Sequence, residues 1–411
     1  MIERLPNGLT LGFRQLPGRQ TARVCVASRM GSRYEKEDER GLIHFCEHAL
    51  LGGTKAISSA EVKKEIELLG GGFNAFTSHD MISIEGDFTR HDCSRALDLV
   101  GELFFHPAFP KAFVDQERKV ILQEIAMNRD DPWDTVSQGA YDLFYRGKGV
   151  GAAILGDEEA LKTHNVTRVR NYWKRVSATS NSLIYMVGNL TEADMKYARE
   201  RYADLPKTSG RCARKTTVYA GKRSVDTQDK DQVYVSILFE APELEDQKGC
   251  IQAEVLSAVL GAGMNSRIWK RVREKMGAAY DARSSFDVFR RNGHLELSAA
   301  LDPKKWEKAM DAMIDELRKV AHQKPPSKRE VDCAVKGLVR STTIMADDPL
   351  VVADYDMTAM AAGCREFTFD RRKDLISQVN QQGVRDIAAS IFDSGEPTVQ
   401  VLGPVDSDFF S

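Results

Sequence analysis

The stretch His44-Phe45-Cys46-Glu47-His48 is the strongest guide to what this chain forms. In a helix, residues four apart lie on one face, one turn from each other, so the imidazoles of His44 and His48 can bind a single ion. The carboxyl group of Glu47 reaches the same side, where it can take a proton from a metal-bound water. H-x-x-E-H reverses the commoner H-E-x-x-H motif and is itself a zinc-protease pattern. The stretch therefore predicts a helix that carries part of a catalytic metal site.

Around this helix, the first half of the chain alternates between strand-like and helix-like sequence. Ser58 and Glu61 form a capping box that predicts the start of the next helix. The expected elements are strands at 8–13 and 22–30 joined as a hairpin, the histidine helix, a helix at 59–69, strands at 72–78 and 81–88, helices at 93–105 and 111–129, a strand at 182–188 and a helix at 191–202.

The same order recurs after a polar stretch that we interpret as a linker at 206–216. The expected elements there are a strand at 232–239, helices at 252–260 and 266–275, strands at 279–288 and 294–300, helices at 304–321 and 327–343, and a strand at 397–402. The repeat predicts two homologous domains, 1–205 and 217–411, of which only the first has the histidine pair. Paired strands with grouped helices predict an α+β fold in which each domain is a mostly antiparallel sheet packed with helices.

Composition and charge narrow the functional classes. The chain has 411 residues, of which 42% are hydrophobic and 29% charged, as in ordinary globular proteins. Its net charge of -2 argues against nucleic acid or an anionic membrane as a main partner. The chain has no membrane-length apolar run and no signal-like N-terminus, and its seven scattered cysteines include no C-x-x-C pair. We therefore expect a cytoplasmic protein with reduced thiols.

A catalytic zinc ion usually has three protein ligands and a water, so two histidines leave the site incomplete. The predicted helix at 111–129 offers Glu117 and Glu124, seven residues apart and hence near one face. Glu124 lies among apolar residues, where an uncompensated carboxylate would be costly and a metal ion would compensate it.

These residues together resemble the pitrilysin family of zinc metallopeptidases, which includes insulinase and mitochondrial processing peptidase. The resemblance rests on H-x-x-E-H at 44–48, on the following Gly53-Thr54, and on Glu124 at the position of the family's third ligand. It implies a half-clamshell of the short type that dimerises, with one Zn²⁺ per protomer bound by His44, His48 and Glu124.

The resemblance also implies roles for residues outside the ligand set. Glu47 would be the general base and then the proton shuttle, and Glu117 an auxiliary glutamate that orients a ligand. The segment 273–280 is similar to the family's R-E-x-x-G-x-A-Y, in which Arg273 and Tyr280 would hold substrate and stabilise the oxyanion. They would complete the site in trans, in a homodimer or with a related chain.

The segment 70–77 resembles the family's substrate-binding edge strand. There Asn74, Ala75 and Phe76 would pair with an extended peptide through backbone hydrogen bonds, which carry little side-chain specificity. The expected substrates are unfolded peptides or presequence-like segments.

The sequence thus predicts a zinc metalloendopeptidase, and it leaves other interpretations open. One is a catalytically silent structural or partner subunit, such as the core proteins of respiratory complexes, although those relatives lose zinc residues that this chain keeps. Others are a subunit that needs a different Arg/Tyr-bearing chain, and a chaperone that binds peptides without cutting them. The plain alternatives are core histidines at 44 and 48, solvated surface residues at 117, 273 and 280, and a turn residue at 74. We assign nothing to the histidines at 79, 91, 106, 164, 294 and 322.

Overall fold

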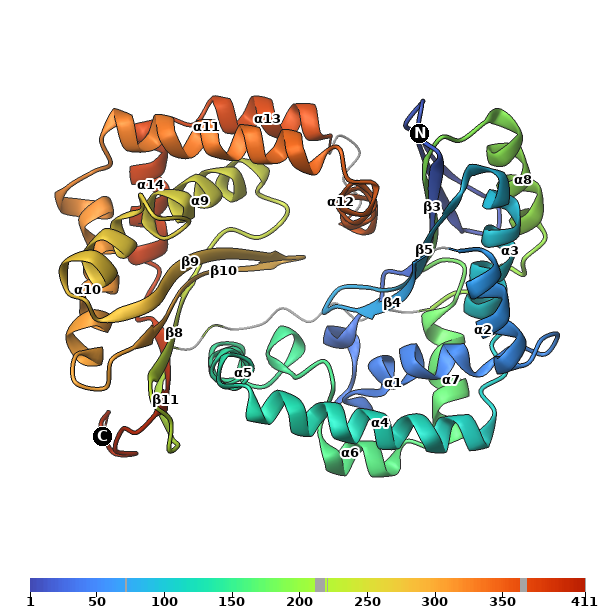
Figure 1. Cartoon of the computed structure of the whole chain (residues 1–411), viewed down its shortest axis with the longest axis horizontal. Coiled ribbons are helices and arrows are strands. Elements are labelled where there is room, and N and C mark those ends of the chain that lie inside the picture. The colour runs from blue at the N-terminus through green and yellow to red at the C-terminus, as the bar shows by residue number, and fades with distance from the viewer. Residues whose placement is uncertain (71, 211–218, 220, 363–367, 411) are drawn as a thin grey trace. The chain divides into compact units, whose positions relative to one another are not determined.

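A computed structural model describes residues 1–70, 72–210, 219, 221–362 and 368–410. The chain divides into two compact units, whose elements are drawn in Figure 1. Unit 1 contains the described residues of Met1–Ala126, Ala152–Lys215 and Ala346–Arg365, and unit 2 contains those of Met127–Gly151, Thr216–Met345 and Glu366–Ser411.

Unit 1 is built on a sheet that has six strands in the described part of the chain, in the order β1-β2-β6-β3-β5-β4. The pair β2 and β6 is parallel and the other pairs are antiparallel. Its strands are β1 (Ile2–Arg4), β2 (Thr10–Gln15), β3 (Thr21–Ser28), β4 (Phe73–Thr77), β5 (Ile82–Thr89) and β6 (Ser182–Gly188). Its helices are α1 (Leu42–Ala49), α2 (Ser59–Leu68), α3 (Cys93–Phe105), α4 (Lys111–Asp130, of which the part up to Ala126 belongs to this unit), α6 (Glu158–Thr163), α7 (Val166–Val176), α8 (Glu192–Ala203) and α12 (Pro349–Ala362).

Unit 2 has a sheet of five strands among the described residues, in the order β7-β11-β8-β10-β9. The strands are β7 (Arg223–Thr227), β8 (Val233–Glu240), β9 (Ala279–Phe289), β10 (Asn292–Leu301) and β11 (Thr398–Gly403). The helices are α5 (Pro132–Phe144), α9 (Gln247–Leu260), α10 (Trp306–Arg318), α11 (Lys328–Met345), α13 (Phe369–Ser377) and α14 (Gln381–Phe392).

Short helical turns of the two units are η1 (Ser32–Tyr34), η2 (Glu37–Glu39), η3 (Leu50–Gly52), η4 (Arg90–Asp92), η5 (Gly149–Gly151) and two π-helical turns, η6 (Trp269–Lys275) and η7 (Lys319–Gln323). None of the described helices is both long enough and apolar enough to cross a membrane.

The two sheets repeat one topology. In unit 2 the parallel pair is β7 and β11, and the remaining neighbours are antiparallel, as in unit 1. Strands β2, β6, β3, β5 and β4 therefore correspond in order and direction to β7, β11, β8, β10 and β9. This correspondence confirms the predicted α+β class with two homologous, mostly antiparallel domains.

The core of unit 1 lies between its sheet and helix α3, which packs against β3 and β5. Val24, Ile84, Leu97 and Val100 are fully buried there. This packing makes the sheet the rigid base on which the loops and helices of the unit are mounted.

The expected hairpin of strands 8–13 and 22–30 is wrong, although both strands exist. Strand β6 lies between β2 and β3 and pairs with each of them. Most residues of β2 and β3 are buried, so both edges of each strand need hydrogen-bonding partners. The strand between them comes from residues 182–188, far along the chain, and local patterning predicts this strand without showing which strands it pairs with.

Other local predictions are confirmed by the structure. The backbone N–H of Ser58 donates to Glu61 and the N–H of Glu61 donates to the Ser58 hydroxyl, which closes the capping box of α2. Helix α3 has the predicted bounds, 93–105. The predicted helix at 266–275 instead contains the π-helical turn η6, for which the sequence pattern has no signal.

Helices α5 and α12 cross the expected domain boundaries of 1–205 and 217–411. Helix α5 packs on β8 and β11 of unit 2, where the rings of Trp133 and Tyr234 are 5.3 Å apart. Helix α12 packs on β3 and β6 of unit 1, and its Asp356 forms an ion pair of 2.6 Å with Arg14 of the neighbouring strand β2. The two homologous units thus exchange one helix each.

The expected linker at 206–216 is described only as far as residue 210, and residues 211–216 lie outside the described part. Thr208 is bonded to unit 1, because its backbone N–H donates to the Thr179 hydroxyl at 2.9 Å. The N–H of Gly210 donates to Ser180 at 3.1 Å. The first part of this stretch is therefore attached to unit 1.

The N-terminus of helix α1 is fixed by the buried carboxyl group of Glu35. This group accepts the backbone N–H of Gly41 at 2.9 Å and that of Ile43 at 2.7 Å, which satisfies donors that a helix start leaves open. Gly41 has φ +74, and a Cβ there would meet the carbonyl oxygen of Leu155 at 2.4 Å. Burial raises the pKa of Glu35 to about 8.

We expect Glu35→Gln to destabilise unit 1 in a pH-dependent way. The folded-state pKa of Glu35 lies above its unfolded value of 4.5, so the wild-type contribution is full below pH 4.5 and is lost as the pH rises through about 8. In the variant, the NH2 group of the glutamine side chain would face one of the two backbone N–H groups, and two donors cannot form a hydrogen bond. The substitution should lower the free energy of unfolding by about 1–3 kcal/mol at pH 5, and by less at pH 9, in urea titrations followed by circular dichroism. Exposed Glu37→Gln is the control, and a wild-type-to-variant difference that is constant with pH would contradict this account.

Candidate metal centre

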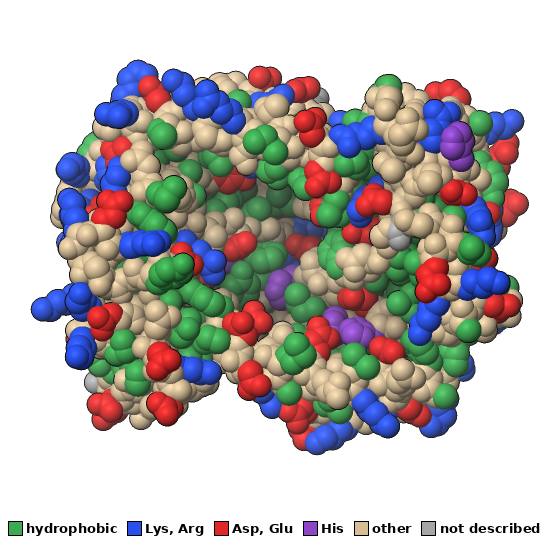
Figure 2. Space-filling model, viewed as in Figure 1, with side chains coloured by type: hydrophobic (Ala, Val, Ile, Leu, Met, Phe, Trp, Pro, Cys, Tyr) green, Lys and Arg blue, Asp and Glu red, His purple; other side chains and the backbone are tan. Residues whose placement is uncertain are grey.

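Helices α1 and α4 bring the three predicted metal ligands together. The ligand atoms of His44, His48 and Glu124 all lie within 4.8 Å of one another. The Nε2 atoms of His44 and His48 are 3.8 and 3.5 Å from the same carboxylate oxygen, Oε2 of Glu124. Histidine side chains reach the surface beside acidic side chains over the region in which Figure 1 draws α1, β4 and α4 (Figure 2). The cluster is therefore compact, and the exposed fraction of its side chains rises from 9% at His44 to 39% at Glu124.

Helix α4 is held against the rest of unit 1 by a buried stripe of Val114, Ile121 and Ile125. Ile121 lies between Glu117 and Glu124 in the sequence, so burial of this stripe directs both carboxylates toward one side of the helix.

A second attachment of α4 is polar. The guanidinium of Arg118 stacks on the ring of Phe45 in α1, with 5.5 Å from Cζ to the ring centroid. The same group donates to the carbonyl of His164 at 2.5 Å, and the ring of His164 stacks on the Phe45 ring at 6.4 Å. These contacts fix α4 relative to the histidine helix.

Glu117 contacts a ligand and is not among the three converging groups. Its Oε2 lies 3.2 Å from Nδ1 of His48, and its side chain is only 15% exposed. A carboxylate on one ring nitrogen sets the tautomer and orientation of the imidazole, which leaves Nε2 of His48 directed at Glu124. The geometry is that of a residue that orients a ligand.

The electrostatics favour a neutral imidazole at His44. Burial, with a smaller contribution from the neighbouring His48, lowers the pKa of His44 to about 3. Nδ1 of His44 is buried and has no hydrogen-bonding partner among the described residues. A neutral imidazole is the form that binds a metal, and two imidazole nitrogens with one carboxylate oxygen are a donor set suited to zinc. The residues present therefore fit the ion.

Glu47 is held next to the cluster by a residue that the sequence pattern did not single out. The hydroxyl of Thr77 donates to Oε2 of Glu47 at 2.5 Å. Burial raises the pKa of Glu47, and the Thr77 hydrogen bond acts in the opposite direction. Thr77 ends strand β4, directly after the three residues predicted to bind substrate, but only the packing of β4 on α1 shows that it reaches Glu47.

Asn74, Ala75 and Phe76 lie in β4, which is the edge strand of the sheet of unit 1. In the described part of the chain β4 pairs only with β5, with Asn74 opposite Glu85. An edge strand leaves a row of backbone N–H and C=O groups unpaired, so the predicted substrate-binding segment is at a position suited to pairing with a peptide.

Arg273 and Tyr280 also lie together, in unit 2. Arg273 is in the turn η6 and Tyr280 is at the start of β9, which is the edge strand of its sheet. The Cζ atom of Arg273 is 5.1 Å from the centroid of the Tyr280 ring.

Strands β9 and β10 bring another histidine among carboxylates, which sequence spacing did not reveal. The ligand atoms of Asp287, His294 and Glu296 lie within 4.8 Å of one another. Nδ1 of His294 is 2.8 Å from the hydroxyl of Tyr145, and Ser236 donates to Glu296 at 2.7 Å. Burial raises the pKa of both carboxyl groups. Because protein groups already bond this cluster, we interpret it as a structural network beneath α5.

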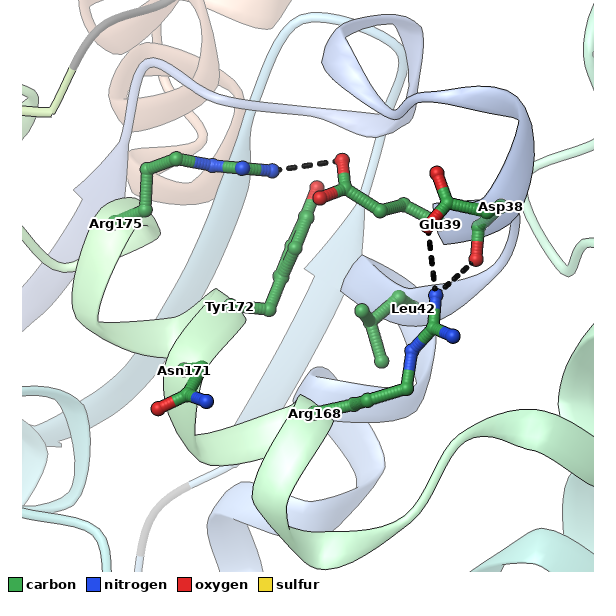
Figure 3. Close-up of a pocket in the computed structure, with 7 residues that line it drawn as sticks. All are labelled: Asp38, Glu39, Leu42, Arg168, Asn171, Tyr172 and Arg175. Carbon is green, nitrogen blue, oxygen red and sulfur yellow. Dashed lines mark hydrogen bonds and ion pairs between the residues drawn. The ribbon is translucent and has the colours of Figure 1, made fainter.

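A polar cavity of about 280 Å³ lies beside α7, and Figure 3 shows the residues that line it. Arg175 is paired with Glu39 at 2.8 Å, and Arg168 with Asp38 at 3.2 Å. Each arginine is thus neutralised by an acid, and no predicted site residue lines the cavity. The pairs connect α7 to the turn η2 that precedes α1, so they support the histidine helix from its N-terminal side.

Two family models match the chain. The model described as insulinase (peptidase family M16) matches residues 13–158, and the model described as peptidase M16 inactive domain matches residues 164–338. The first match contains the histidine pair and Glu124, and the second begins after them.

Relatives and solved structures agree with these models. An uncharacterized zinc protease of Rickettsia bellii is 25% identical over 404 residues, which cover 98% of this chain and 97% of the relative. An uncharacterized zinc protease of Streptomyces coelicolor is 26% identical over 412 residues, with 98% and 89% covered. The crystal structure of a protease from Helicobacter pylori has the same fold, with a TM-score of 0.91, 16% identity and 98% of both chains covered. A peptidase M16 inactive domain from Pseudomonas fluorescens also has a TM-score of 0.91, at 16% identity, with 99% and 98% covered.

Removing the carboxylate of the cluster should remove the metal. We expect Glu124→Ala to lose bound zinc, because two imidazoles alone hold the ion weakly, whereas Glu117→Gln should bind zinc with about 10- to 100-fold lower affinity through loss of support to His48. Zinc per chain is measured by elemental analysis after dialysis against buffered metal. Unchanged stoichiometry in Glu124→Ala would reject this residue as a ligand.

Proposed function

The chain belongs to the insulinase family of peptidases, peptidase family M16, and on this basis we propose that it is a zinc-dependent endopeptidase. The observation that carries the proposal is the convergence of His44, His48 and Glu124 on one point, with Glu47 alongside. The relatives that match almost the whole chain are called zinc proteases, which supports the same ion.

In this proposal each side chain of the site has a separate role in peptide hydrolysis. A bound zinc ion would lower the pKa of a water molecule and polarise the carbonyl group of the scissile bond. Glu47 accepts the proton of the attacking water and returns it to the departing amine, which makes it first the general base and then the general acid. Thr77 holds the carboxylate of Glu47 in one orientation. Glu117 orients His48.

We further propose that the substrate is an extended segment of an unfolded or presequence-like peptide. Such a segment would add to strand β4 at Asn74, Ala75 and Phe76, because the edge offers unpaired backbone groups. Pairing through the backbone alone selects for extended chain and gives little preference for sequence.

The protomer is proposed to work as a homodimer, or with a related chain, in which Arg273 and Tyr280 act on substrate at the zinc site of the other protomer. Both residues offer hydrogen-bond donors, and Tyr280 is 77% exposed. Such donors stabilise the negative charge that develops on the scissile carbonyl oxygen.

The main alternative is a catalytically silent subunit. The match to the inactive-domain model covers residues 164–338, where none of the proposed zinc ligands lies, so it does not favour that alternative. A chaperone that binds peptides without cutting them would have the same edge strand, and analysis of the products formed from a peptide mixture separates it from a peptidase.

Glu47→Gln tests the proposal directly. The amide cannot accept the proton of the attacking water, so we expect kcat to fall by about 10³-fold or more while zinc content is unchanged. Turnover is measured with an internally quenched peptide and zinc by elemental analysis. Glu67→Gln, an exposed glutamate of α2, is the matched control. A variant at position 47 that cleaves as fast as the wild type would show that Glu47 is not the base.

Mixed protomers test the shared site. Glu47→Gln and Arg273→Ala are each expected to have strongly reduced activity alone, because each removes one group from every site. If the halves act across a dimer, mixing and re-equilibrating the two variants yields some dimers with one intact site, and we expect up to about a quarter of the wild-type rate, since half of the dimers are mixed and each has one such site. Activity that stays at the level of the separate variants would argue against sharing.

A further inference from the structure

Arg273 differs from its neighbour in the same helical turn. The guanidinium of Arg271 pairs with acids on α10, at 2.7 Å from Glu316. Within the described residues, the guanidinium of Arg273 forms no ion pair and donates to no acceptor, and its contacts are with two aromatic rings. A charged group whose donors are all uncommitted is ready to bind an acceptor from outside the chain.

Two aromatic rings contact the guanidinium of Arg273. Its Cζ atom is 4.1 Å from the centroid of the Trp269 ring and 5.1 Å from that of the Tyr280 ring. Attraction of a guanidinium to a ring face does not need a hydrogen-bond acceptor, so these contacts leave the N–H groups of Arg273 available to donate. The position of the charge is thus fixed without using its donors.

The local backbone explains why the Trp269 ring contacts the guanidinium of Arg273. Trp269 and Arg273 are four residues apart in the π-helical turn η6, so they share one side of it. Ile268 and Val272 are fully buried and anchor the turn in the core of unit 2. Segments with π-helical bonding are frequent at functional sites. The indole is therefore mounted on a fixed base.

Tyr280 adds a further hydrogen-bond donor beside Arg273. Its ring contacts Arg273, while its hydroxyl has no hydrogen-bonding partner in the described part of the chain. The arginine donors and the tyrosine hydroxyl are thus neighbouring donors that the protein itself does not use.

We propose that Trp269 is a positioning residue whose indole, together with the Tyr280 ring, holds the guanidinium of Arg273 so that its N–H donors face an acceptor oxygen of a bound peptide. This inference rests on the proposed peptidase function. It adds a residue that acts through Arg273 and does not itself touch the substrate.

The test compares Trp269→Leu, Trp269→Phe, Arg273→Ala and the double variant Trp269→Leu/Arg273→Ala. Leucine fills space without a π face, and phenylalanine keeps the face. We expect kcat/KM on an internally quenched peptide to fall about tenfold in Trp269→Leu and less than threefold in Trp269→Phe, as loss or retention of one cation–π contact predicts. The double variant should be no slower than Arg273→Ala, because the indole acts only through the arginine.

Arg271→Ala is the matched control, since it removes an arginine of the same turn that is bonded to acids. It should lower the melting temperature and leave kcat/KM within about twofold of wild type. Zinc content should be equal in all variants. If the effects of Trp269→Leu and Arg273→Ala multiply in the double variant, or if Trp269→Phe is as slow as Trp269→Leu, the proposal is overturned.

A binding measurement separates failure of this inference from failure of the peptidase proposal. The affinity of a fluorescein-labelled unfolded peptide is measured by anisotropy in the Glu47→Gln background, which needs no turnover. We expect Arg273→Ala to weaken binding, Trp269→Leu to weaken it by no more than Arg273→Ala does, and Trp269→Phe to bind like the parent, whether or not the wild type cleaves. Equal affinity in all four proteins would overturn the positioning role, whereas absence of zinc-dependent cleavage by the wild type would overturn only the peptidase proposal.

Discussion

The site depends on helix α4 being held at one position along helix α1. Three ligand atoms from two helices can meet only if neither helix slides, because a shift of one residue moves a side chain by 1.5 Å along the axis and by about 100° around it. Burial of Ile121 between the two glutamates sets the rotation of α4, and the stacking of Arg118 on Phe45 sets its position along α1. The carboxyl group of Glu35 fixes the N-terminus of α1, because it accepts backbone N–H groups there. Side chains that never contact the ion thus determine whether a site exists.

Much of this arrangement could be predicted from the sequence where the signal is local. A capping box, an apolar stripe or two histidines four residues apart each depend on one turn of helix, and α2, α3 and the histidine helix formed as predicted. The remainder depends on contacts between distant residues. The insertion of β6 between β2 and β3, and the hydrogen bond from Thr77 to Glu47, join segments that no short window contains. The π-helical form of η6 is a choice between backbone hydrogen-bond patterns that sequence periodicity does not distinguish.

The two units use one topology for different chemistry. In unit 1 the helix that follows the central strand β3 carries the histidine pair, whereas α9 at the corresponding place in unit 2 carries Glu254, which is paired with Arg372 at 2.8 Å. The second helical position also differs, since α2 in unit 1 corresponds to the turn η6 with its stacked arginine. The shared sheet gives both copies an equivalent edge strand, β4 or β9, next to these positions. Duplication of the fold therefore supplied two similar frames, and substitution of a few side chains made them distinct.

The exchange of α5 and α12 has a consequence for the integrity of the molecule. Each sheet is covered in part by a helix encoded in the opposite half of the gene, so neither half contains everything needed to shield its own apolar surface. If the chain were cut between its two halves, each unit would still contain a helix from the other fragment, α12 in unit 1 and α5 in unit 2. The same holds during synthesis on the ribosome. Helix α12 cannot cover the sheet of unit 1 until residues 349–362 have been synthesised.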